Sequence, residues 1–388
     1  MPMYDAEDIV ELKNRKKRKK RRIKFLVFLL IAGVVTGLYY YRDSWYPKLK
    51  GLGRKVQIIE NNGRLAEGNF PIYLSGNSKY QLQYSDDLLM LMCDAYIYYY
   101  TDNGGVLKRR QHIYSNPVMK ASNGNVLIYE SGGEEFCLEN EDEVEYTKTL
   151  DDPIMFGEVS SDGYTAIVTV SDKYACKLLV FDDYGDIIYE RDCVERIGDI
   201  SFINNSKGCI ISYIGAANGA VTSNVQKVTF TAKEADWTSP NVETLGMQVY
   251  GNDGGAVLIG YESCSYIGDG GTIDSVYNYD GDFAGGESRG GKTAVLINDE
   301  YRRKYHVVMF NGSGDSPLSV EIGEPLKCVK IADGLVYVMS QSKLQAFDFN
   351  GELRSTVNIS DTYSEFRRSE DYIFLMGYDH IDRIDYNS

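Results

Sequence analysis

The sequence predicts an all-β protein: a seven- or eight-bladed β-propeller ectodomain preceded by one N-terminal transmembrane helix. Three observations support this prediction. An apolar run follows a basic run near the N-terminus, an aromatic residue followed four positions later by glycine recurs along the rest of the chain, and a second turn signal accompanies several of these repeats. The predicted organisation is a cytoplasmic basic tail (1–22), a transmembrane helix (23–41), a juxtamembrane spacer (42–55) and a propeller domain (56–388).

The N-terminal region has the pattern of a membrane anchor. Residues 13–22 are basic at nine of ten positions, and residues 23–41 are apolar apart from Lys24 and Thr36. Nineteen helical residues span about 28 Å, close to the roughly 30 Å hydrocarbon thickness of a bilayer. Because Lys and Arg remain on the cytoplasmic side, we expect a single-pass cell-membrane protein with its N-terminus in the cytoplasm and its large domain outside. The expected outer aromatic belt is Tyr39, Tyr40, Tyr41, Trp45 and Tyr46.

Two other interpretations of this region are weaker. A cleaved signal peptide has a shorter apolar stretch followed by small residues, whereas this stretch ends in three tyrosines and Arg42. The second interpretation is that the basic run is a tail that binds nucleic acid. The remainder of the chain argues against nucleic acid, because residues 1–55 carry a net charge of +10 and the other residues carry −25. Gly33 and Gly37 form a GxxxG pattern that would allow a weak homodimer of the anchor.

The body of the chain is repetitive. Aromatic-x-x-x-Gly marks are separated by 29 to 52 residues, about 41 on average, when one degenerate copy is included. The marks are Tyr100…Gly104, Tyr129…Gly133, Phe181…Gly185, the degenerate Phe230…Glu234, Tyr277…Gly281, Phe310…Gly314 and Phe347…Gly351.

Each mark is interpreted as the outer hairpin of one repeat unit. Residues 176–181 alternate as a strand, Asp182–Gly185 form a turn in which glycine supplies a positive φ, and residues 186–190 form the next strand. Second turn signals lie at Asn123-Gly124, Asp162-Gly163, Asn205–Gly208, Asp253–Gly255 and Asp333-Gly334. Two hairpins give four strands per unit, which is the signature of a propeller blade.

Closure of the ring is also predicted. A strand at Phe70–Leu74 is expected to join the C-terminal strands at 372–376 and 381–386, which removes exposed sheet edges. Because the repeated pattern is short and its spacing scatters, a pair of β-sandwiches or a set of unrelated hairpins is the alternative.

A family resemblance becomes visible along these residues. The basic tail and single anchor are followed by Phe70-Pro71-Ile72, Tyr96–Tyr100…Gly104, Tyr114–Val118 and Tyr129…Gly133. This order resembles an uncharacterised bacterial family, domain of unknown function 5711, over most of residues 25–388. The resemblance implies a membrane-tethered, extracytoplasmic propeller similar to WD40-like and quinoprotein-like propellers. It brings no catalytic residues.

Two motifs suggest ligands but lack the context they need. Gly286–Thr293 matches the phosphate-loop pattern, yet a strand-like segment follows it where a helix is required. Asn278, Asp280 and Asp282 alternate as calcium-loop oxygens do, inside an acidic, glycine-rich insertion at Gly268–Gly291. Glycine and glutamate are missing from the sixth and twelfth positions, so these residues are weak calcium candidates and a solvated loop is the default.

No other cofactor or catalytic site is predicted. The three histidines are His112, His306 and His380; they are far apart and lack zinc-ligand spacing, and no Ser-His-Asp constellation or nucleophile elbow is present. We therefore expect no cofactor, no metal site and no catalytic residues that the sequence alone identifies.

The cysteines are dispersed and odd in number, which is typical of small core residues rather than a disulfide scaffold. They are Cys93, Cys137, Cys176, Cys193, Cys209, Cys264 and Cys328. In a hairpin centred on Gly185, Cys176 and Cys193 would face each other, so a disulfide between them is the one pairing we predict for an oxidising exterior.

The tyrosines give the remaining indication of function. Tyr261, Tyr266, Tyr277 and Tyr279 surround the glycine-rich stretch and are candidates for a ligand face, although strands favour tyrosine in any case. The first hypothesis is a non-enzymatic binding or scaffolding module for an envelope protein or glycan. The second is an envelope hydrolase with acidic residues around the propeller channel. Fold analogy supports part of the first.

Overall fold

A computed structural model of the chain describes residues 68–74, 79–93, 95–203, 205–232, 234–252, 254–312 and 316–385. The predicted basic tail, transmembrane helix and spacer lie outside these residues. Within the described part of the chain, no helix has both the length and the apolar character that crossing a bilayer requires.

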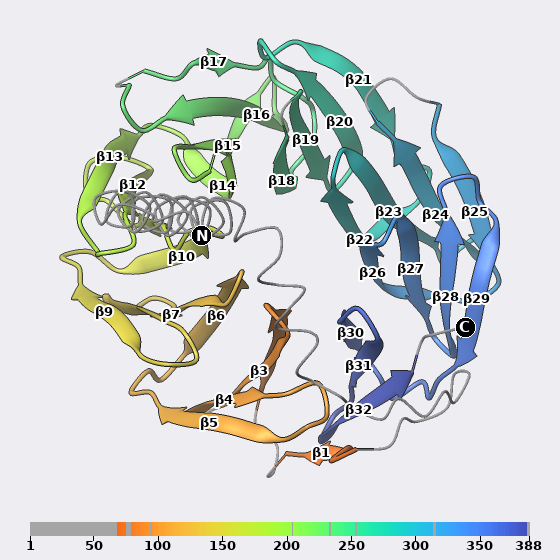
Figure 1. The fold of residues 1–388 in the computed structure, drawn as a ribbon. Helices are drawn as coiled ribbons and strands as arrows, with labels where there is room; N and C mark the ends of the chain where they lie inside the picture. Colours follow the sequence, from red (N-terminus) through yellow and green to blue (C-terminus); the bar gives the residue numbers. More distant parts are fainter. Residues whose placement is uncertain are drawn as a thin grey trace, which may run out of the picture. The chain divides into compact units, whose positions relative to one another are not determined.

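The described residues form an eight-bladed β-propeller, which confirms the predicted propeller and selects eight blades (Figure 1). Each blade is a four-stranded antiparallel sheet in which strands that follow each other in the chain are hydrogen-bonded neighbours. The first strand of each blade lies at the centre of the ring and the fourth at its rim. First strands of neighbouring blades, such as β14 and β18, contact each other around the central channel.

The first four blades take residues 81–238. Blade 1 is β2 (Gln81–Ser85), β3 (Leu88–Cys93), β4 (Tyr96–Tyr100) and β5 (Val106–Gln111). Blade 2 is β6 (Pro117–Ser122), β7 (Asn125–Glu130), β8 (Glu135–Glu139) and β9 (Val144–Thr149). Blade 3 is β10 (Ile154–Val159), β11 (Thr165–Thr169), β12 (Cys176–Phe181) and β13 (Ile187–Cys193). Blade 4 is β14 (Arg196–Ile203), β15 (Gly208–Ala217), β16 (Ala220–Thr229) and β17 (Trp237–Thr238).

The last four blades complete the ring. Blade 5 is β18 (Gly246–Asn252), β19 (Gly255–Gly260), β20 (Ser263–Gly268) and β21 (Ile273–Asn278). Blade 6 is β22 (Asp282–Arg289), β23 (Lys292–Asp299), β24 (Lys304–Asn311) and β25 (Leu318–Ile322). Blade 7 is β26 (Leu326–Ala332), β27 (Leu335–Ser340), β28 (Lys343–Asp348) and β29 (Leu353–Asn358). Blade 8 is β30 (Glu365–Arg368), β31 (Tyr372–Met376), β32 (His380–Asp385) and β1 (Ile72–Tyr73).

The two ends of the described chain meet in blade 8, as the sequence predicts. β1 pairs with β32 in the register Ile72↔Ile381 and Tyr73↔His380. Ile72 packs in a core cluster with Ile381 and Phe374 from the C-terminal strands. Because β1 comes from the N-terminal side and the other three strands of blade 8 come from the C-terminal side, blade 8 joins the two ends of the described chain and closes the ring.

The core consists of the layers between neighbouring blades. The middle strands are buried on both faces, so they are continuous apolar runs rather than alternating ones; in β3, five consecutive residues from Leu88 to Met92 are buried. One cluster joins Val168 of β11 and Leu178 of β12 to Ile200 of β14 and Ile211 of β15. Each blade is therefore stabilised mainly by the blade beside it.

The repeated mark is the turn between third and fourth strands. In blade 3, the buried Phe181 ends β12, and the carboxylate Oδ1 of Asp182 accepts hydrogen bonds from the N–H groups of Tyr184 (3.0 Å) and Asp186 (2.8 Å). Gly185 has φ of 82°, a left-handed conformation that favours glycine. The same turn follows a buried aromatic residue at Tyr100…Gly104 and at Phe347…Gly351.

Two of the marks lie elsewhere, which corrects the prediction that each one is an outer hairpin. Tyr129…Gly133 is the turn between the second and third strands of blade 2, and Tyr277…Gly281 is the connection from blade 5 to blade 6. Gly314 lies outside the described residues. The pattern is short enough to match any tight turn that follows a strand ending in an aromatic residue. The second turn signals are confirmed as hairpin turns, and they join first and second strands.

Candidate functional site

The turns and connections divide between two faces of the ring. Because neighbouring strands are antiparallel, the turns between first and second and between third and fourth strands lie on one face. The turns between second and third strands and the blade-to-blade connections lie on the other. The chain enters the ring on the first of these faces, where the N–H of Asn69 donates to the carbonyl oxygen of Asn103 at 3.0 Å.

The first face is acidic, and we call it the carboxylate face. In blades 1–3 its turns contain no lysine or arginine among their residues, all of which the structure describes. Its acidic residues in these blades are Asp86, Asp87, Asp102, Glu141, Asp142, Glu143, Asp162, Asp182, Asp183 and Asp186. This face repels anions and attracts cations.

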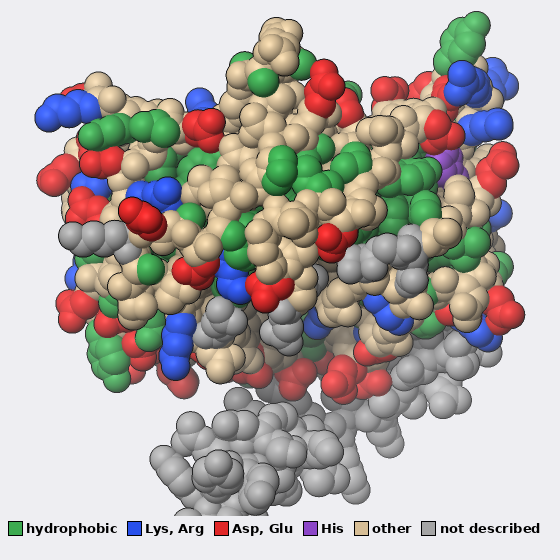
Figure 2. Space-filling view, turned by 90° about the horizontal axis from the view of Figure 1, so that it is seen from above, with side chains coloured by type: hydrophobic (Ala, Val, Ile, Leu, Met, Phe, Trp, Pro, Cys, Tyr) green, Lys and Arg blue, Asp and Glu red, His purple; other side chains and the backbone are tan. Residues whose placement is uncertain are grey.

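The opposite face exposes tyrosines at its loops, and we call it the tyrosine face. These tyrosines come from loops of blades 3, 5, 6 and 8 and are Tyr174, Tyr261, Tyr301 and Tyr378. The side chains of Tyr301 and Tyr378 are 97% and 70% exposed. The edge-on view in Figure 2 shows many acidic side chains along one edge of the ring, whereas hydrophobic side chains stand among charged ones at tips of the opposite edge.

A polar cavity of about 680 Å³ occupies one side of the central channel. Its wall is formed by the first strands of blades 2–5 and by the turns that follow β10 and β14. We call it the channel pocket; the residues that line it are Lys120, Ser122, Glu158, Val159, Ser160, Ser161, Asp199, Ile200, Ser201, Phe202, Ile203, Asn205, Ser206, Met247, Gln248, Val249 and Tyr250.

Three charged side chains determine the electrostatics of the channel pocket. Lys120 of β6 and Glu158 of β10 form an ion pair between neighbouring blades. A β-bulge between Ile197 and Asp199 interrupts the register of β14, and Asp199 lies in the pocket wall beyond it. The carboxylate Oδ2 of Asp199 accepts a 2.8 Å hydrogen bond from the N–H of Val249. Burial, together with the negative charge of Glu158, raises the pKa of Asp199 to about 6.

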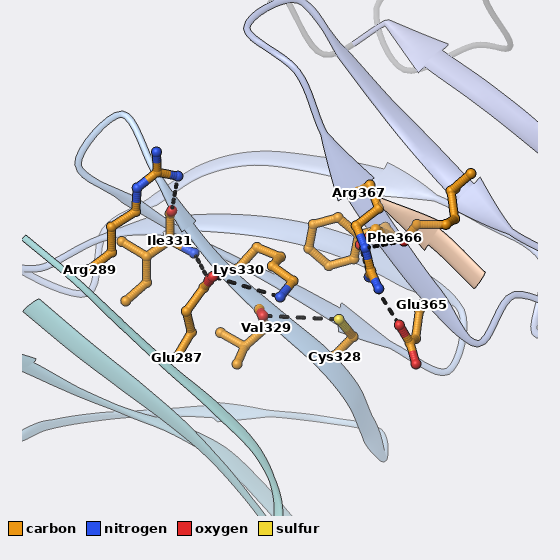
Figure 3. Close-up of polar contacts among 10 residues, drawn as sticks. Glu287, Arg289, Cys328, Val329, Lys330, Ile331, Glu365, Phe366 and Arg367 are labelled. Atoms are coloured by element: carbon orange, nitrogen blue, oxygen red, sulfur yellow. Dashed lines mark hydrogen bonds and ion pairs between the residues drawn. The ribbon is translucent and has the colours of Figure 1, made fainter. Parts of the chain in front are cut away.

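On the other side of the ring, polar side chains tie the first strands together (Figure 3). Glu287 of β22 accepts a hydrogen bond from the N–H of Ile331 on β26, and its other oxygen lies 3.7 Å from Nζ of Lys330. Nη1 of Arg289 donates to the carbonyl oxygen of Ile331 at 3.4 Å. From β30, Nε of Arg367 donates to the carbonyl oxygen of Leu82 on β2 at 2.8 Å. These charges connect one blade to the next.

The candidate tyrosines do not form one exposed ligand face, which corrects the expected placement. Tyr266 is buried in the core beside Phe310, at 5.6 Å between ring centroids, and Tyr277 packs on the same ring at 5.5 Å. Tyr279 stacks on Phe283. Of the four candidates, only Tyr261 is exposed. Tyrosines on β20 and β21 fill the layer between blades 5 and 6, because that layer needs large apolar surfaces. Tyr301 and Tyr378 were missed because they stand outside any motif.

The stretch predicted as an acidic insertion is regular structure. Gly268–Gly291 contains β21 and β22, so the weak calcium candidates Asn278, Asp280 and Asp282 lie at and between the ends of these strands. Oδ1 of Asp280 lies 3.0 Å from Nε2 of His306. Within the described part of the chain, no group of three or more His, Cys, Asp or Glu residues is placed to hold a metal ion.

The other two motifs have the placement that the sequence analysis expects. The phosphate-loop pattern spans the β22–β23 hairpin, with Gly290 and Gly291 in its turn and a strand where a helix is required. Cys176 and Cys193 are paired directly across β12 and β13. Both are buried free thiols, as are Cys137, Cys209 and Cys264. A disulfide between Cys176 and Cys193 stays a prediction.

The arrangement defines an eight-bladed β-propeller with a polar channel pocket and two chemically distinct faces. Residues 68–257 match the sequence model of a family of unknown function (DUF5711), which confirms the resemblance over these residues. No curated protein sequence matches the chain.

Three solved structures illustrate the similarity of fold. BamB from Moraxella catarrhalis has a TM-score of 0.54 at 10% identity, covering 81% of this chain and 100% of BamB. The computationally designed protein Ika8 has a TM-score of 0.64 at 10% identity, covering 81% of this chain and 98% of Ika8. Saccharomyces cerevisiae Sqt1 has a TM-score of 0.62 at 8% identity, covering 84% and 100%. At these identities the likeness concerns the fold.

Proposed function

We propose that this protein is a non-enzymatic binding or scaffolding module of the cell envelope, anchored in the membrane by residues 23–41. In this proposal the tyrosine face engages an envelope protein or glycan. One observation carries the proposal: loops of four different blades present exposed tyrosines on the same face. Turns between antiparallel strands tolerate many other residues, so large aromatic side chains at these tips are not needed for the fold.

Tyrosine suits this role for physical reasons. Its ring supplies a large apolar contact area, its hydroxyl supplies a hydrogen bond, and only two side-chain torsions are fixed on binding. The ring of blades holds the loops in place, so little conformational entropy is lost when a partner docks. A partner that spans Tyr301 and Tyr378 contacts blades 6 and 8 at once, which is the contact a scaffold provides.

Affinity capture tests this face. The full-length chain in non-ionic detergent is compared with the double variant Tyr301→Ser/Tyr378→Ser. The matched control is Tyr184→Ser, because Tyr184 is 79% exposed but lies in a turn of the carboxylate face. The proposal predicts that a reproducible partner is lost from the double variant and kept by the control. Equal capture by all three chains contradicts the role of the tyrosine face.

The membrane location rests on the sequence and is tested separately. A tag placed after Ser388 is followed while intact cells and lysed cells are treated with protease. Loss of the tag from intact cells supports an external domain, whereas survival until lysis contradicts it. A purified sample treated under the same conditions controls for resistance of the folded ring to the protease.

An envelope hydrolase is the second candidate, because Glu158 and Asp199 share the channel pocket and the pKa of Asp199 is raised to about 6. A raised pKa favours a carboxyl group that gives and takes protons near neutral pH. The ion pair of Glu158 with Lys120 and the hydrogen bond from Val249 to Asp199 give both carboxylates structural roles as well. Turnover of an envelope substrate that is abolished by Asp199→Asn in a folded chain would favour the enzyme.

A further inference from the structure

The channel pocket has an unbalanced charge. Its charged side chains are one ammonium group, on Lys120, and two carboxylates, on Glu158 and Asp199. Lys120 forms its ion pair with Glu158. Among the described residues, no lysine or arginine forms an ion pair with Asp199, which accepts the N–H of Val249 instead. When Asp199 is ionised, the pocket therefore carries one uncompensated negative charge.

The ionised carboxylate of Asp199 is energetically unfavourable at this position. Asp199 is largely removed from water, and three first strands of other blades bring titratable side chains that interact with it electrostatically: Lys120 of β6, Glu158 of β10 and Tyr250 of β18. Burial and Glu158 both disfavour the ionised form, and Lys120 only partly offsets them. A second cation in the pocket would remove this cost and gain charge-assisted hydrogen bonds.

The channel pocket has the size and the lining to hold a small, partly apolar ligand. Its volume of about 680 Å³ lies within the range of small-molecule sites. Phe202 and Ile203 provide an apolar wall for methylene groups, while Ser161 and Asn205 lie in turns of the carboxylate face. Asp162 stands in the same turn as Ser161, and the turns of blades 1–3 around it are acidic. The field on this side of the ring attracts a cation toward the pocket.

We propose that the channel pocket binds an alkylammonium group, whose N–H groups donate to the carboxylates of Asp199 and Glu158. The site is separate from the tyrosine face, so it does not depend on the role proposed for that face. The ammonium group has two chemical sources, a free polyamine or a lysine side chain of a peptide. Both present a primary ammonium at the end of a methylene chain.

Titration calorimetry at pH 7.5 and low salt tests the proposal on the full-length chain in non-ionic detergent. The first probe is spermidine, and the second is the capped tripeptide acetyl-Gly-Lys-Gly-amide. Saturable binding of either probe supports the site, and the tighter probe identifies the source. Absence of binding by both probes at millimolar concentration overturns the proposal.

Two variants and one control assign the binding to the pocket. Asp199→Asn keeps an acceptor for the N–H of Val249 but removes the charge, and it is expected to weaken binding at least tenfold. The control Asp183→Asn removes one exposed charge from the carboxylate face and is expected to change the affinity by less than twofold. Equal effects of the two variants would show that only the general field of the face attracts the probe, which overturns the pocket.

Lys120→Met gives an independent test with the opposite sign. It leaves Glu158 without its ammonium partner, so the probe is expected to bind more tightly. Circular dichroism establishes that each variant is folded. Should Asp199→Asn fail to fold, Lys120→Met decides alone: tighter binding supports the proposal, and unchanged or weaker binding overturns it.

Discussion

Closure of the ring by β1 predicts a large difference between two neighbouring residues. Ile72 is 9% exposed and packs against strands of blades 1 and 8, whereas Tyr73 on the same two-residue strand is 75% exposed. Truncating a buried isoleucine to alanine costs about 2–5 kcal/mol through lost apolar contact and the cavity left behind. The partial exposure of Ile72 places Ile72→Ala in the lower part of this range, at about 2–4 kcal/mol. Tyr73→Ala is expected to stay within about 0.5 kcal/mol.

Hydrogen exchange followed by mass spectrometry measures this effect locally. If Ile72→Ala weakens the pairing of β1 with β32, amides of β32 exchange roughly 30- to 700-fold faster, since each 1.4 kcal/mol is a factor of ten. Amides of β15, in blade 4, serve as the internal reference. Exchange of β32 that is unchanged by Ile72→Ala, or accelerated equally by Tyr73→Ala, would refute the closure by β1.

Three further predictions concern single sites. Gly185→Ala introduces a Cβ at φ of 82° and 2.9 Å from Cγ of Tyr146, whereas Gly219→Ala has φ of 84° and nothing within 4 Å. Each substitution lowers the free energy of unfolding by about 1–2 kcal/mol because alanine disfavours the left-handed backbone. Thermal melts should show Gly185→Ala as the less stable variant, since only its Cβ meets Tyr146. Equal melting temperatures would contradict the effect of this contact. Because the pKa of Asp199 is raised to about 6 in the fold, against about 3.9 in an unfolded chain, the folded chain binds this proton more tightly, and stability is lost as pH rises through 6. Denaturant unfolding at pH 4.5 and 7.5 should show wild type losing about 2 kcal/mol relative to Asp199→Asn, and parallel profiles would contradict the shift. Cys176 and Cys193 should each gain an alkyl group only after reduction in chain taken from the cell envelope, and alkylation before reduction argues against the disulfide.

The turn chemistry made much of the fold predictable from sequence. Asp182 and Gly185 are required locally, one to accept backbone N–H groups and one to adopt a positive φ, so the third-to-fourth turn is recognisable wherever both are present. Blade 2 shows why the count of blades stayed open. Its corresponding turn uses Asn140, whose Oδ1 accepts the N–H groups of Asp142 and Glu143 without any glycine.

The channel pocket was not predictable in the same way. Lys120, Glu158 and Asp199 belong to three different repeat units, and no spacing between them forms a motif. They meet only because the ring brings the first strand of every blade to the channel. Acidic residues at the channel were expected, but the chain has too many carboxylates for the sequence to indicate which of them lie there. Likewise, Tyr301 is conspicuous only once its loop is known to stand on a face of the ring.

Site-specific photocrosslinking in intact cells tests the central claim, that this propeller is a binding module acting through its tyrosine face. A photoreactive phenylalanine analogue is placed at Tyr301, at Tyr378 and, as the matched position on the carboxylate face, at Tyr184. We expect one discrete crosslinked partner from Tyr301 and Tyr378 and none from Tyr184. Crosslinking of that partner from Tyr184, or no crosslink from either position on the tyrosine face, would contradict it.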